Sequence, residues 1–264
     1  MLAQGYSYQK KLLSDEMNEL KKKVLDIINR GWINDSRPNN KDGGIGNTFE
    51  DLLGIKENNK SVADYKNVEI KCQREFTGAY ISLFSKSPTS PFRANKQLRE
   101  KFGEERDEIH TGMKKLYASV FGNKNSKVYE KYLMKLEIDK RNSTLMLVIN
   151  DLNNNILDQV AWTFDSLIKA SSKIENLLLV FAKTQMSNNQ RQFCFFNAEI
   201  FSDFDFNKFL ICIEEGYIQF DIRIGVYNSG KNYGKTHDHG SAFRIKYENI
   251  KKLYNKLERL DGKK

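Results

Sequence analysis

The sequence predicts an α/β protein in which a mixed β-sheet is flanked by helices. Stretches with apolar residues at three- and four-residue steps, which are typical of amphipathic helices, occur along the whole chain. Between them lie short alternating or apolar stretches that are typical of strands. Because helices and strands are interspersed and no sequence repeat is visible, the class is α/β or α+β with a mixed sheet.

The N-terminal part is expected to begin with an amphipathic helix over residues 10–29. Its apolar positions are Leu13, Met17, Leu20, Val24, Ile27 and Ile28. Gly31 ends this helix, and a polar, glycine-rich loop follows over residues 33–47. A short helix with the sequence FEDLLG comes next and is stopped by Gly54.

Beyond residue 60 the sequence predicts a longer series of elements. Residues 68–72 and 79–86 read as two strands that we expect to form a hairpin. After them we expect a helix over 94–102, strands over 115–121, 132–139 and 144–150, a linker over 151–156, a helix over 164–172, strands over 177–184 and 192–200, a helix over 205–215, a strand over 217–227, a loop over 228–240, a strand over 242–246 and an amphipathic helix over 250–260.

The totals limit the classes of function. The chain has 264 residues, of which 43 are Lys or Arg and 34 are Asp or Glu, so its formal charge is +9. A basic chain favours polyanions, although this balance also fits a basic protein with no nucleic-acid role. Cys72, Cys194 and Cys212 show neither disulfide-framework nor zinc spacing, so we expect buried thiols in a reducing compartment. No membrane-length apolar run and no signal peptide is visible, so we expect a cytoplasmic protein without a membrane partner.

The stretch DYKNVEIK, residues 64–71, is the strongest candidate for chemistry. On a strand, successive side chains point to opposite faces, so Glu69 and Lys71 would face a cleft together. Asp64, just upstream, can come in beside them. Two carboxylates and an ammonium can bind Mg²⁺ and activate a water against a phosphodiester, but this spacing alone also fits a solvated strand face. Glu50, in the first turn of the short helix, is either a surface acid or a further member of this acidic site.

A second polar stretch is YNSGKNYGKTHDHGSAFR, residues 227–244. Its lysines, histidines, arginine, aspartate and asparagines offer the donors and acceptors that read base edges in the DNA major groove. Three other interpretations stay open. The stretch also fits a solvated hairpin tip, a phosphate-binding loop that uses Lys231 and Lys235, or a metal site at His237 and His239 that would need a third ligand.

Four blocks in a fixed order carry a resemblance to a known family. They are GGIGNTFEDLLGIKEN from Gly43, the D-x4-E-x-K element with Arg74 close behind, LFSKSP from Leu83, and THDHGSAFRI from Thr236. Together they resemble the MvaI/BcnI group of type II restriction endonucleases, which are relatives of the mismatch-repair nickase MutH. The resemblance runs through most of the chain. It departs from the superfamily pattern at Ala63, where the superfamily's name has proline.

The resemblance implies a PD-(D/E)xK restriction-endonuclease-like core in two lobes around a DNA-binding cleft. We expect residues 1–155 to form the catalytic lobe and residues 156–264 the DNA-recognition lobe, with the polar stretch DLNNNI at the boundary. The protein would be a site-specific deoxyribonuclease that uses Mg²⁺ to hydrolyse double-stranded DNA and leaves 5′-phosphate ends.

The resemblance also assigns residues, position by position. Asp64 and Glu69 would coordinate Mg²⁺, and Lys71 would orient the attacking water and help to deprotonate it. Glu50 matches the acidic residue of the helix before the motif, and Lys115 matches a further lysine of the MutH-like site in a loose alignment. The residues implied in DNA contact are Lys231, Tyr233, His237, Asp238, His239 and Arg244.

Partners follow from the same resemblance, and two other functions stay open. The family implies a monomer, and a cognate DNA methyltransferase is expected as a partner of the restriction system, not as a bound subunit. The first alternative is a MutH-like endonuclease that nicks one strand. The second, of another class, is a sequence-specific DNA-binding protein without catalysis.

Overall fold

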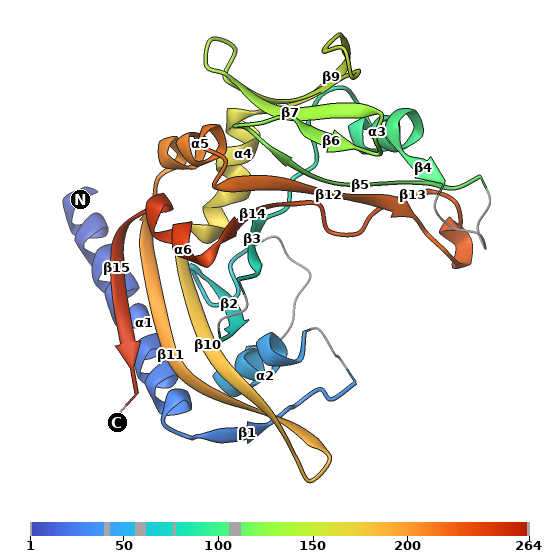
Figure 1. Ribbon diagram of the computed structural model, residues 1–264. Coiled ribbons are helices and arrows are strands. Elements are labelled where there is room, and N and C mark those ends of the chain that lie inside the picture. Colours follow the sequence, from blue (N-terminus) through green and yellow to red (C-terminus); the bar gives the residue numbers. More distant parts are fainter. Residues whose placement is uncertain (1, 40–42, 56–61, 76–77, 106–111, 263–264) are drawn as a thin grey trace. The chain divides into compact units, whose positions relative to one another are not determined.

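The computed structural model describes residues 2–39, 43–55, 62–75, 78–105 and 112–262 (Figure 1). The chain divides into two compact units. Unit 1 consists of residues 1–77, 175–203 and 255–264, and unit 2 of residues 78–174 and 204–254. None of the described helices is long and apolar enough to cross a membrane.

Unit 1 is built on a mixed sheet whose strand order is β1-β11-β10-β2, with β15 also paired to β11. Its strands are β1 (Trp32–Asn34), β2 (Val68–Arg74), β10 (Asn176–Ser187), β11 (Gln190–Phe204) and β15 (Tyr254–Asp261), and its helices are α1 (Leu2–Ile28) and α2 (Gly44–Leu53). β10 runs antiparallel to β11 and parallel to β2. The mixed sheet with helices that the sequence predicted is therefore confirmed.

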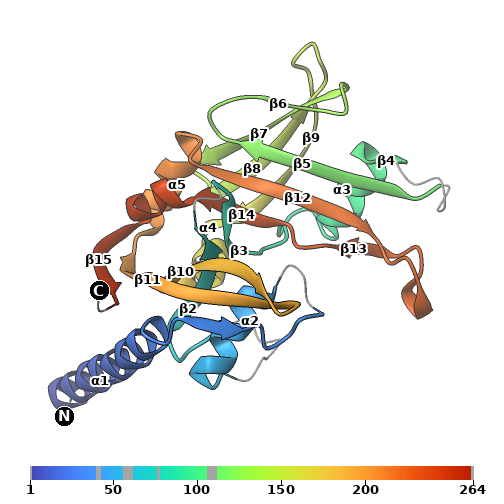
Figure 2. The same cartoon turned by 60° about the horizontal axis from the view of Figure 1, so that its bottom comes forward.

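The core of unit 1 lies between this sheet and the two helices (Figure 2). Leu20, Val24 and Ile27 of α1 are buried at the helical spacing that the sequence showed. Phe49 of α2 is fully buried and packs on Phe195 of β11, with ring centroids 5.0 Å apart. The apolar face of α2 thus holds this helix on the same sheet that carries β2.

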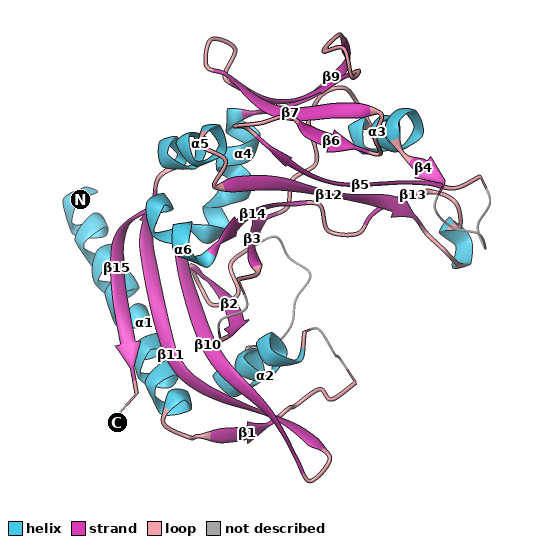
Figure 3. Ribbon diagram, in the orientation of Figure 1, coloured by secondary structure: helices cyan, strands magenta, loops and turns pink. Residues whose placement is uncertain are grey.

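Unit 2 contains two further sheets, shown in magenta in Figure 3. The first has the order β3-β14-β12-β5-β4 with β13 on β12, and the second the order β6-β7-β8-β9. Their strands are β3 (Tyr80–Phe84), β4 (Glu104–Glu105), β5 (Lys114–Phe121), β12 (Ile218–Val226), β13 (Thr236–Asp238) and β14 (Ala242–Lys246), then β6 (Ser126–Val128), β7 (Tyr132–Asp139), β8 (Thr144–Asn150) and β9 (Ile156–Thr163). The helices are α3 (Ala94–Phe102), α4 (Phe164–Ser171), α5 (Phe206–Glu214) and α6 (Tyr247–Ile250).

The two sheets of unit 2 meet through aromatic side chains. Trp162 of β9 is fully buried, and its ring lies 4.8 Å from Phe220 of β12 and 5.6 Å from Phe243 of β14, centroid to centroid. Its indole N–H donates to the Lys86 carbonyl at 2.8 Å, so the polar edge of the ring is satisfied in the core.

The expected hairpin of residues 68–72 and 79–86 does not form. β2 pairs in parallel with β10 in unit 1, whereas β3 pairs antiparallel with β14 in unit 2. Alternation of apolar and polar residues identifies a strand and its two faces. Which other strand it pairs with depends on the tertiary packing that buries those faces.

The expected helix over residues 250–260 is also wrong, because residues 254–261 form strand β15. Leu253, Leu257 and Leu260 have helical spacing, yet Leu257 is 44% exposed. The buried residues are Tyr254 and Leu260, six positions apart and hence on one face of a strand. β15 pairs with β11 at the edge of the sheet of unit 1.

The stretch over residues 151–156 is a tight turn and not a linker. Asp151 Oδ1 accepts hydrogen bonds from the N–H groups of Asn153 and Asn155, each at 2.8 Å, and the turn leads directly from β8 into β9. The predicted division between residues 155 and 156 therefore falls inside unit 2. The chain instead passes between the units after residues 77, 174, 203 and 254.

Replacing Phe49 by Ala should lower the free energy of unfolding by about 3–5 kcal/mol, because it removes a buried ring and leaves a cavity under α2. Urea or thermal unfolding of the variant would measure this. Leu257→Ala is the control, since the exposed leucine of β15 should contribute less than about 1 kcal/mol. Equal losses for the two variants would contradict the packing of α2 described above.

Candidate functional site

The predicted catalytic stretch forms a tight turn that leads into β2. Tyr65 and Val68 exchange two backbone hydrogen bonds, at 3.0 and 2.8 Å. The chain is thereby folded back, and Asp64 lies beside the strand that it precedes. Asp64 Oδ2 accepts a hydrogen bond from the Ile70 N–H at 2.9 Å, which fixes this carboxylate next to β2.

Glu69 and Lys71 lie on one face of β2 and contact each other. Lys71 Nζ donates to Glu69 Oε1 at 2.5 Å. The side chain of Lys71 is 30% exposed, but that of Glu69 is only 1% exposed. The sequence predicted that both side chains face a cleft. Glu69 is covered, and its in-register neighbour on β10, Leu177, is also buried. A buried carboxylate requires a compensating charge, and the Lys71 ammonium supplies it.

Glu50 lies on α2, near β2, and its side chain is half-buried. Glu50 lies close enough to β2 for its charge to act on the thiol of Cys72, the residue that follows Lys71. Burial raises the pKa of the Cys72 thiol, the carboxylates of Glu50 and Asp64 raise it further, and the Lys71 ammonium opposes them. Unit 1 therefore places Glu50 and Asp64 near Cys72, and Glu69 and Lys71 on the other face of β2.

An ion pair that no sequence pattern indicated holds the beginning of α2. Arg191 of β11 donates to Asp35 Oδ2 from Nε at 2.8 Å and from Nη2 at 2.5 Å, and the Thr48 hydroxyl donates to Asp35 Oδ1 at 3.2 Å. Burial acts to raise the pKa of Asp35, but the Arg37 N–H and the Arg191 guanidinium hold this pKa below its ordinary value. The two charges are 156 residues apart, so nothing local in the sequence could reveal them.

The donor set around β2 suits a hard divalent cation. Asp64 and Glu69 offer carboxylate oxygens, and Mg²⁺ is commonly bound through one or two carboxylates, with water and substrate phosphates completing its shell. Among the residues that the structure describes, no group of three or more His, Cys, Asp and Glu side chains is arranged to hold a metal ion. This finding also leaves His237 and His239 without the third ligand that a metal site there would need.

The predicted base-reading segment of unit 2 is fixed by Asp238, at the end of β13. Asp238 Oδ1 accepts hydrogen bonds from the N–H groups of Gly240 at 3.0 Å and Ser241 at 2.6 Å. Its Oδ2 accepts one from the Asn95 side-chain amide at 2.9 Å. The carboxylate thus holds a turn on one side and contacts α3 on the other.

The two histidines beside Asp238 pack on each other. The His237 ring stacks on Tyr227, with centroids 4.1 Å apart, and meets the His239 ring edge-on at 4.4 Å. Burial is the first cause that lowers the pKa of His239, and the charges of His237 and Lys115 lower it further, while Asp238 opposes them. Lys115 lies on β5 of unit 2 and is thus grouped with His239; its assignment to the cutting chemistry stays a prediction.

Arg244 lies on β14 and shares a buried carboxylate with a second arginine. Asp221 of β12 is 5% exposed, and its Oδ2 lies 2.7 Å from Arg223 Nε and 3.1 Å from Arg244 Nε. Arg244 Nη2 also donates to the Gly240 carbonyl at 3.2 Å, which ties it to the turn made by Asp238. Arg223, whose side chain is 48% exposed, was not singled out from the sequence, because an arginine in a strand looks like any solvent-facing residue.

Lys231 and Tyr233 lie in the loop between β12 and β13. Both side chains are exposed, Tyr233 by 53%. The Tyr233 N–H donates to the Gly230 carbonyl at 3.0 Å, so the loop has a defined turn. The structure therefore places all six predicted DNA contacts in unit 2 and the four acidic and lysine positions around β2 in unit 1.

Comparison with known proteins decides the family. The family model of the MvaI/BcnI restriction endonuclease family matches residues 21–254. The chain belongs to the MvaI/BcnI restriction endonuclease family. It is thus a type II restriction endonuclease, a site-specific deoxyribonuclease. A comparison with curated protein sequences finds no match.

Two solved structures support this membership of the MvaI/BcnI family. A complex of restriction endonuclease MvaI with its cognate DNA substrate has a TM-score of 0.81 and 34% sequence identity, covering 92% of this chain and 97% of that one. MvaI in the absence of DNA has a TM-score of 0.62 and the same 34% identity, covering 93% of this chain and 97% of that one.

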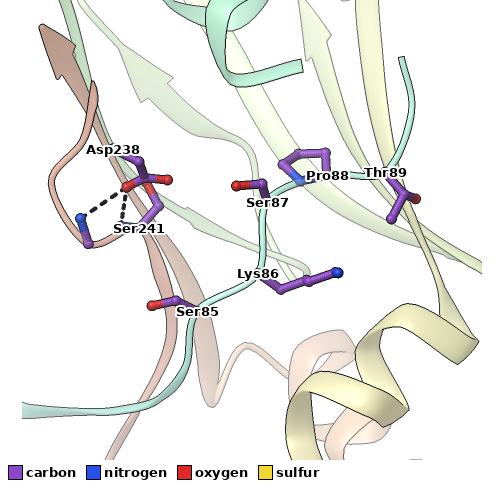
Figure 4. A pocket seen from close by; sticks show the side chains of 8 residues that line it. Ser85, Lys86, Ser87, Pro88, Thr89, Asp238 and Ser241 are labelled. Atoms are coloured by element: carbon purple, nitrogen blue, oxygen red, sulfur yellow. Dashed lines mark hydrogen bonds between the residues drawn. The ribbon is translucent and has the colours of Figure 1, made fainter. Parts of the chain in front are cut away.

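In this member of the MvaI/BcnI family, two of the resemblance blocks line one pocket of unit 2. The pocket, about 540 Å³ in volume, is lined by Ser85, Lys86, Ser87, Pro88, Thr89, Asp238, Gly240 and Ser241. Figure 4 shows Ser87 and Asp238 facing each other across it, and the Asn95 amide donates to both, at 3.1 Å to Ser87 Oγ and 2.9 Å to Asp238 Oδ2. The other two blocks contribute α2 and the beginning of β2 to unit 1.

The pKa of His239 should lie below its ordinary value of 6.5 in the folded protein. NMR titration of the His239 ring, assigned with His239→Gln, would measure it. Because the unfolded chain then binds the proton more tightly, the contribution of His239 to stability is fully present above pH 6.5 and is lost as the pH falls through the lower folded pKa. A midpoint above 6.5 would contradict the packing of the two rings.

Proposed function

We propose that this restriction endonuclease uses Mg²⁺ to hydrolyse phosphodiesters of double-stranded DNA at a specific sequence and leaves 5′-phosphate ends. The observation that carries the proposal is the arrangement of Glu69 and Lys71 on β2 with Asp64 beside the strand, two carboxylates with an ammonium at 2.5 Å from one of them. Double-stranded DNA as the substrate is supported by the MvaI structure, whose DNA is described as its cognate substrate.

The residues of unit 1 would each have a separate role in phosphodiester hydrolysis. Asp64 and Glu69 would hold the Mg²⁺, and Glu50 would add negative charge to the same region. When bound, the ion lowers the pKa of a water and offsets charge that builds on the phosphate. The Lys71 ammonium, which is partly exposed beside a buried carboxylate, would donate hydrogen bonds to the attacking water and hold it in place.

The residues of unit 2 would read the sequence. Arg244 is fixed by Asp221 and by the Gly240 carbonyl, so its guanidinium is held in one orientation, which favours bidentate contact with guanine. Asp238 and the two histidines are fixed by the contacts described above. Donors and acceptors that are already fixed lose less side-chain entropy on binding, which increases the affinity of the contacts they make.

Lys71→Ala should abolish cleavage and preserve specific binding, because the ammonium acts on the reacting water and not on the recognition sequence. Plasmid digestion with and without Mg²⁺, together with gel-shift binding to a duplex that carries a mapped cut site, would measure both effects. Lys256→Ala, on the exposed surface of β15 at the other edge of the sheet, is the matched control and should cut normally.

A Lys71→Ala variant that cuts at a near wild-type rate would remove the assignment of this residue. The plasmid assay also separates the alternatives. Open circles that never become linear on a hemimethylated plasmid would favour strand-specific nicking, and binding without any cut would favour a non-catalytic DNA-binding protein.

Arg244→Ala should weaken binding to the cognate duplex by about 10–100-fold, since one bidentate base contact contributes about 1–3 kcal/mol, and should affect random DNA far less. Asp221 keeps Arg223 as its partner in this variant, so the buried charge stays compensated. Fluorescence anisotropy with both duplexes would measure the ratio, with Arg141→Ala in the exposed turn before β8 as control. Equal losses on the two duplexes would make Arg244 a phosphate contact.

A further inference from the structure

A basic hollow beside the base-reading segment has no role in the proposed function so far. It lies in unit 2, has a volume of about 890 Å³, and is formed by α3 with the residue before it on one side and the loop before β13 on the other. Its charged lining residues are Arg93, Lys96, Arg99, Glu100 and Lys235. Tyr233, already predicted to contact DNA, lies in the opposite wall.

The charge of the hollow favours an anion. Four of its side chains are cationic and one is acidic, and the single carboxylate, Glu100, is already engaged. Glu100 Oε1 lies 3.4 Å from Arg99 Nη2 and 3.8 Å from Lys96 Nζ. Arg93 and Lys235 are both exposed, so a polyanion could reach them without rearrangement of the fold.

Arg93 is held at the rim of the hollow by its neighbour. The Phe92 ring is 80% exposed, and the Arg93 guanidinium lies over it, 5.1 Å from the ring centroid. The Phe92 carbonyl accepts a hydrogen bond from the Gln97 side chain at 3.0 Å, which joins this loop to the first turns of α3. A guanidinium fixed in this way loses less entropy when it meets a phosphate.

The hollow is joined to the base-reading segment by direct contacts. Arg99 is only 8% exposed, and its Nε donates to the Thr236 hydroxyl of β13 at 3.2 Å. One helical turn earlier, Asn95 donates to Asp238 at 2.9 Å. Any duplex that lies along β13 would therefore run beside α3, within reach of its exposed cations.

We propose that this hollow binds backbone phosphates of the DNA next to the recognition sequence, through Arg93 and Lys96 on one wall and Lys235 on the other. The proposal rests on the proposed function, since it needs a DNA duplex on β13. Phosphate contacts carry no sequence information, so these residues would increase affinity for cognate and random DNA alike and would set part of the salt dependence.

The test is the double variant Arg93→Ala with Lys96→Ala, made in the Lys71→Ala background so that the DNA stays intact. Binding to cognate and random duplexes would be measured by anisotropy over a series of salt concentrations. We expect affinity for both duplexes to fall by a similar factor, and the slope of log K against log salt to become shallower by about 2, at about 0.9 per lost phosphate contact. Lys235→Ala, on the opposite wall, should reduce the slope by about 1.

The matched control is Lys140→Ala with Arg141→Ala, which also removes one lysine and one arginine but from the exposed turn before β8. Slopes that stay equal to this control for both hollow variants would overturn the proposal. A loss confined to the cognate duplex would overturn it too, since it would indicate base contact. If the unmodified enzyme neither binds nor cuts DNA, the proposed function fails; if it does both and only the slopes stay unchanged, this inference alone fails.

Discussion

The parallel pairing of β2 with β10 is the constraint on which the unit 1 site depends. It sets Val68, Ile70 and the core residues of β10 on one face and forces Glu69 and Lys71 to the other. Because β2 is otherwise an edge of the described sheet, the turn at Tyr65 can bring Asp64 alongside it without breaking the ladder. A shift of register by one residue would send Glu69 and Lys71 to the core face.

Buried carboxylates with cationic partners recur through the fold, and several of these pairs join segments that are distant in sequence. Glu69 is matched by Lys71 and Glu199 by Arg259. Asp35 is matched by Arg191, and Asp221 by Arg223 and Arg244, as described above. Asp35 shows the cost, because its partner Arg191 is itself only 17% exposed: losing this arginine would leave a buried charge and cost about 3–5 kcal/mol, so the pair fixes geometry more than it adds net stability. Asp35 holds α2, the helix that carries Glu50, and Asp221 orients Arg244, which is proposed to contact guanine.

Each unit is built from segments that alternate along the chain. Unit 1 takes its central hairpin, β10 and β11, from residues that are preceded and followed by unit 2. The strands that position the predicted cutting residues and those that position the predicted reading residues are thus interleaved along the sequence. In unit 2, α3 also joins segments that are distant in sequence. Its residue Asn95 donates hydrogen bonds to Ser87 of the LFSKSP block and to Asp238 of the HDHG block.

The sequence by itself determined the family, the positions of most helices and strands, and the residues that form the two groups. Local patterns were sufficient there, because amphipathic spacing, alternation and short motifs are properties of neighbouring residues. Only the tertiary structure decided that β2 pairs with β10 and not with β3, that residues 254–261 form a strand, and that Glu69 is buried. The contacts of Arg191 with Asp35, of Arg244 with Asp221 and of α3 with β13 also appear only after folding, because each joins side chains whose closeness depends on burial and strand pairing between separate elements.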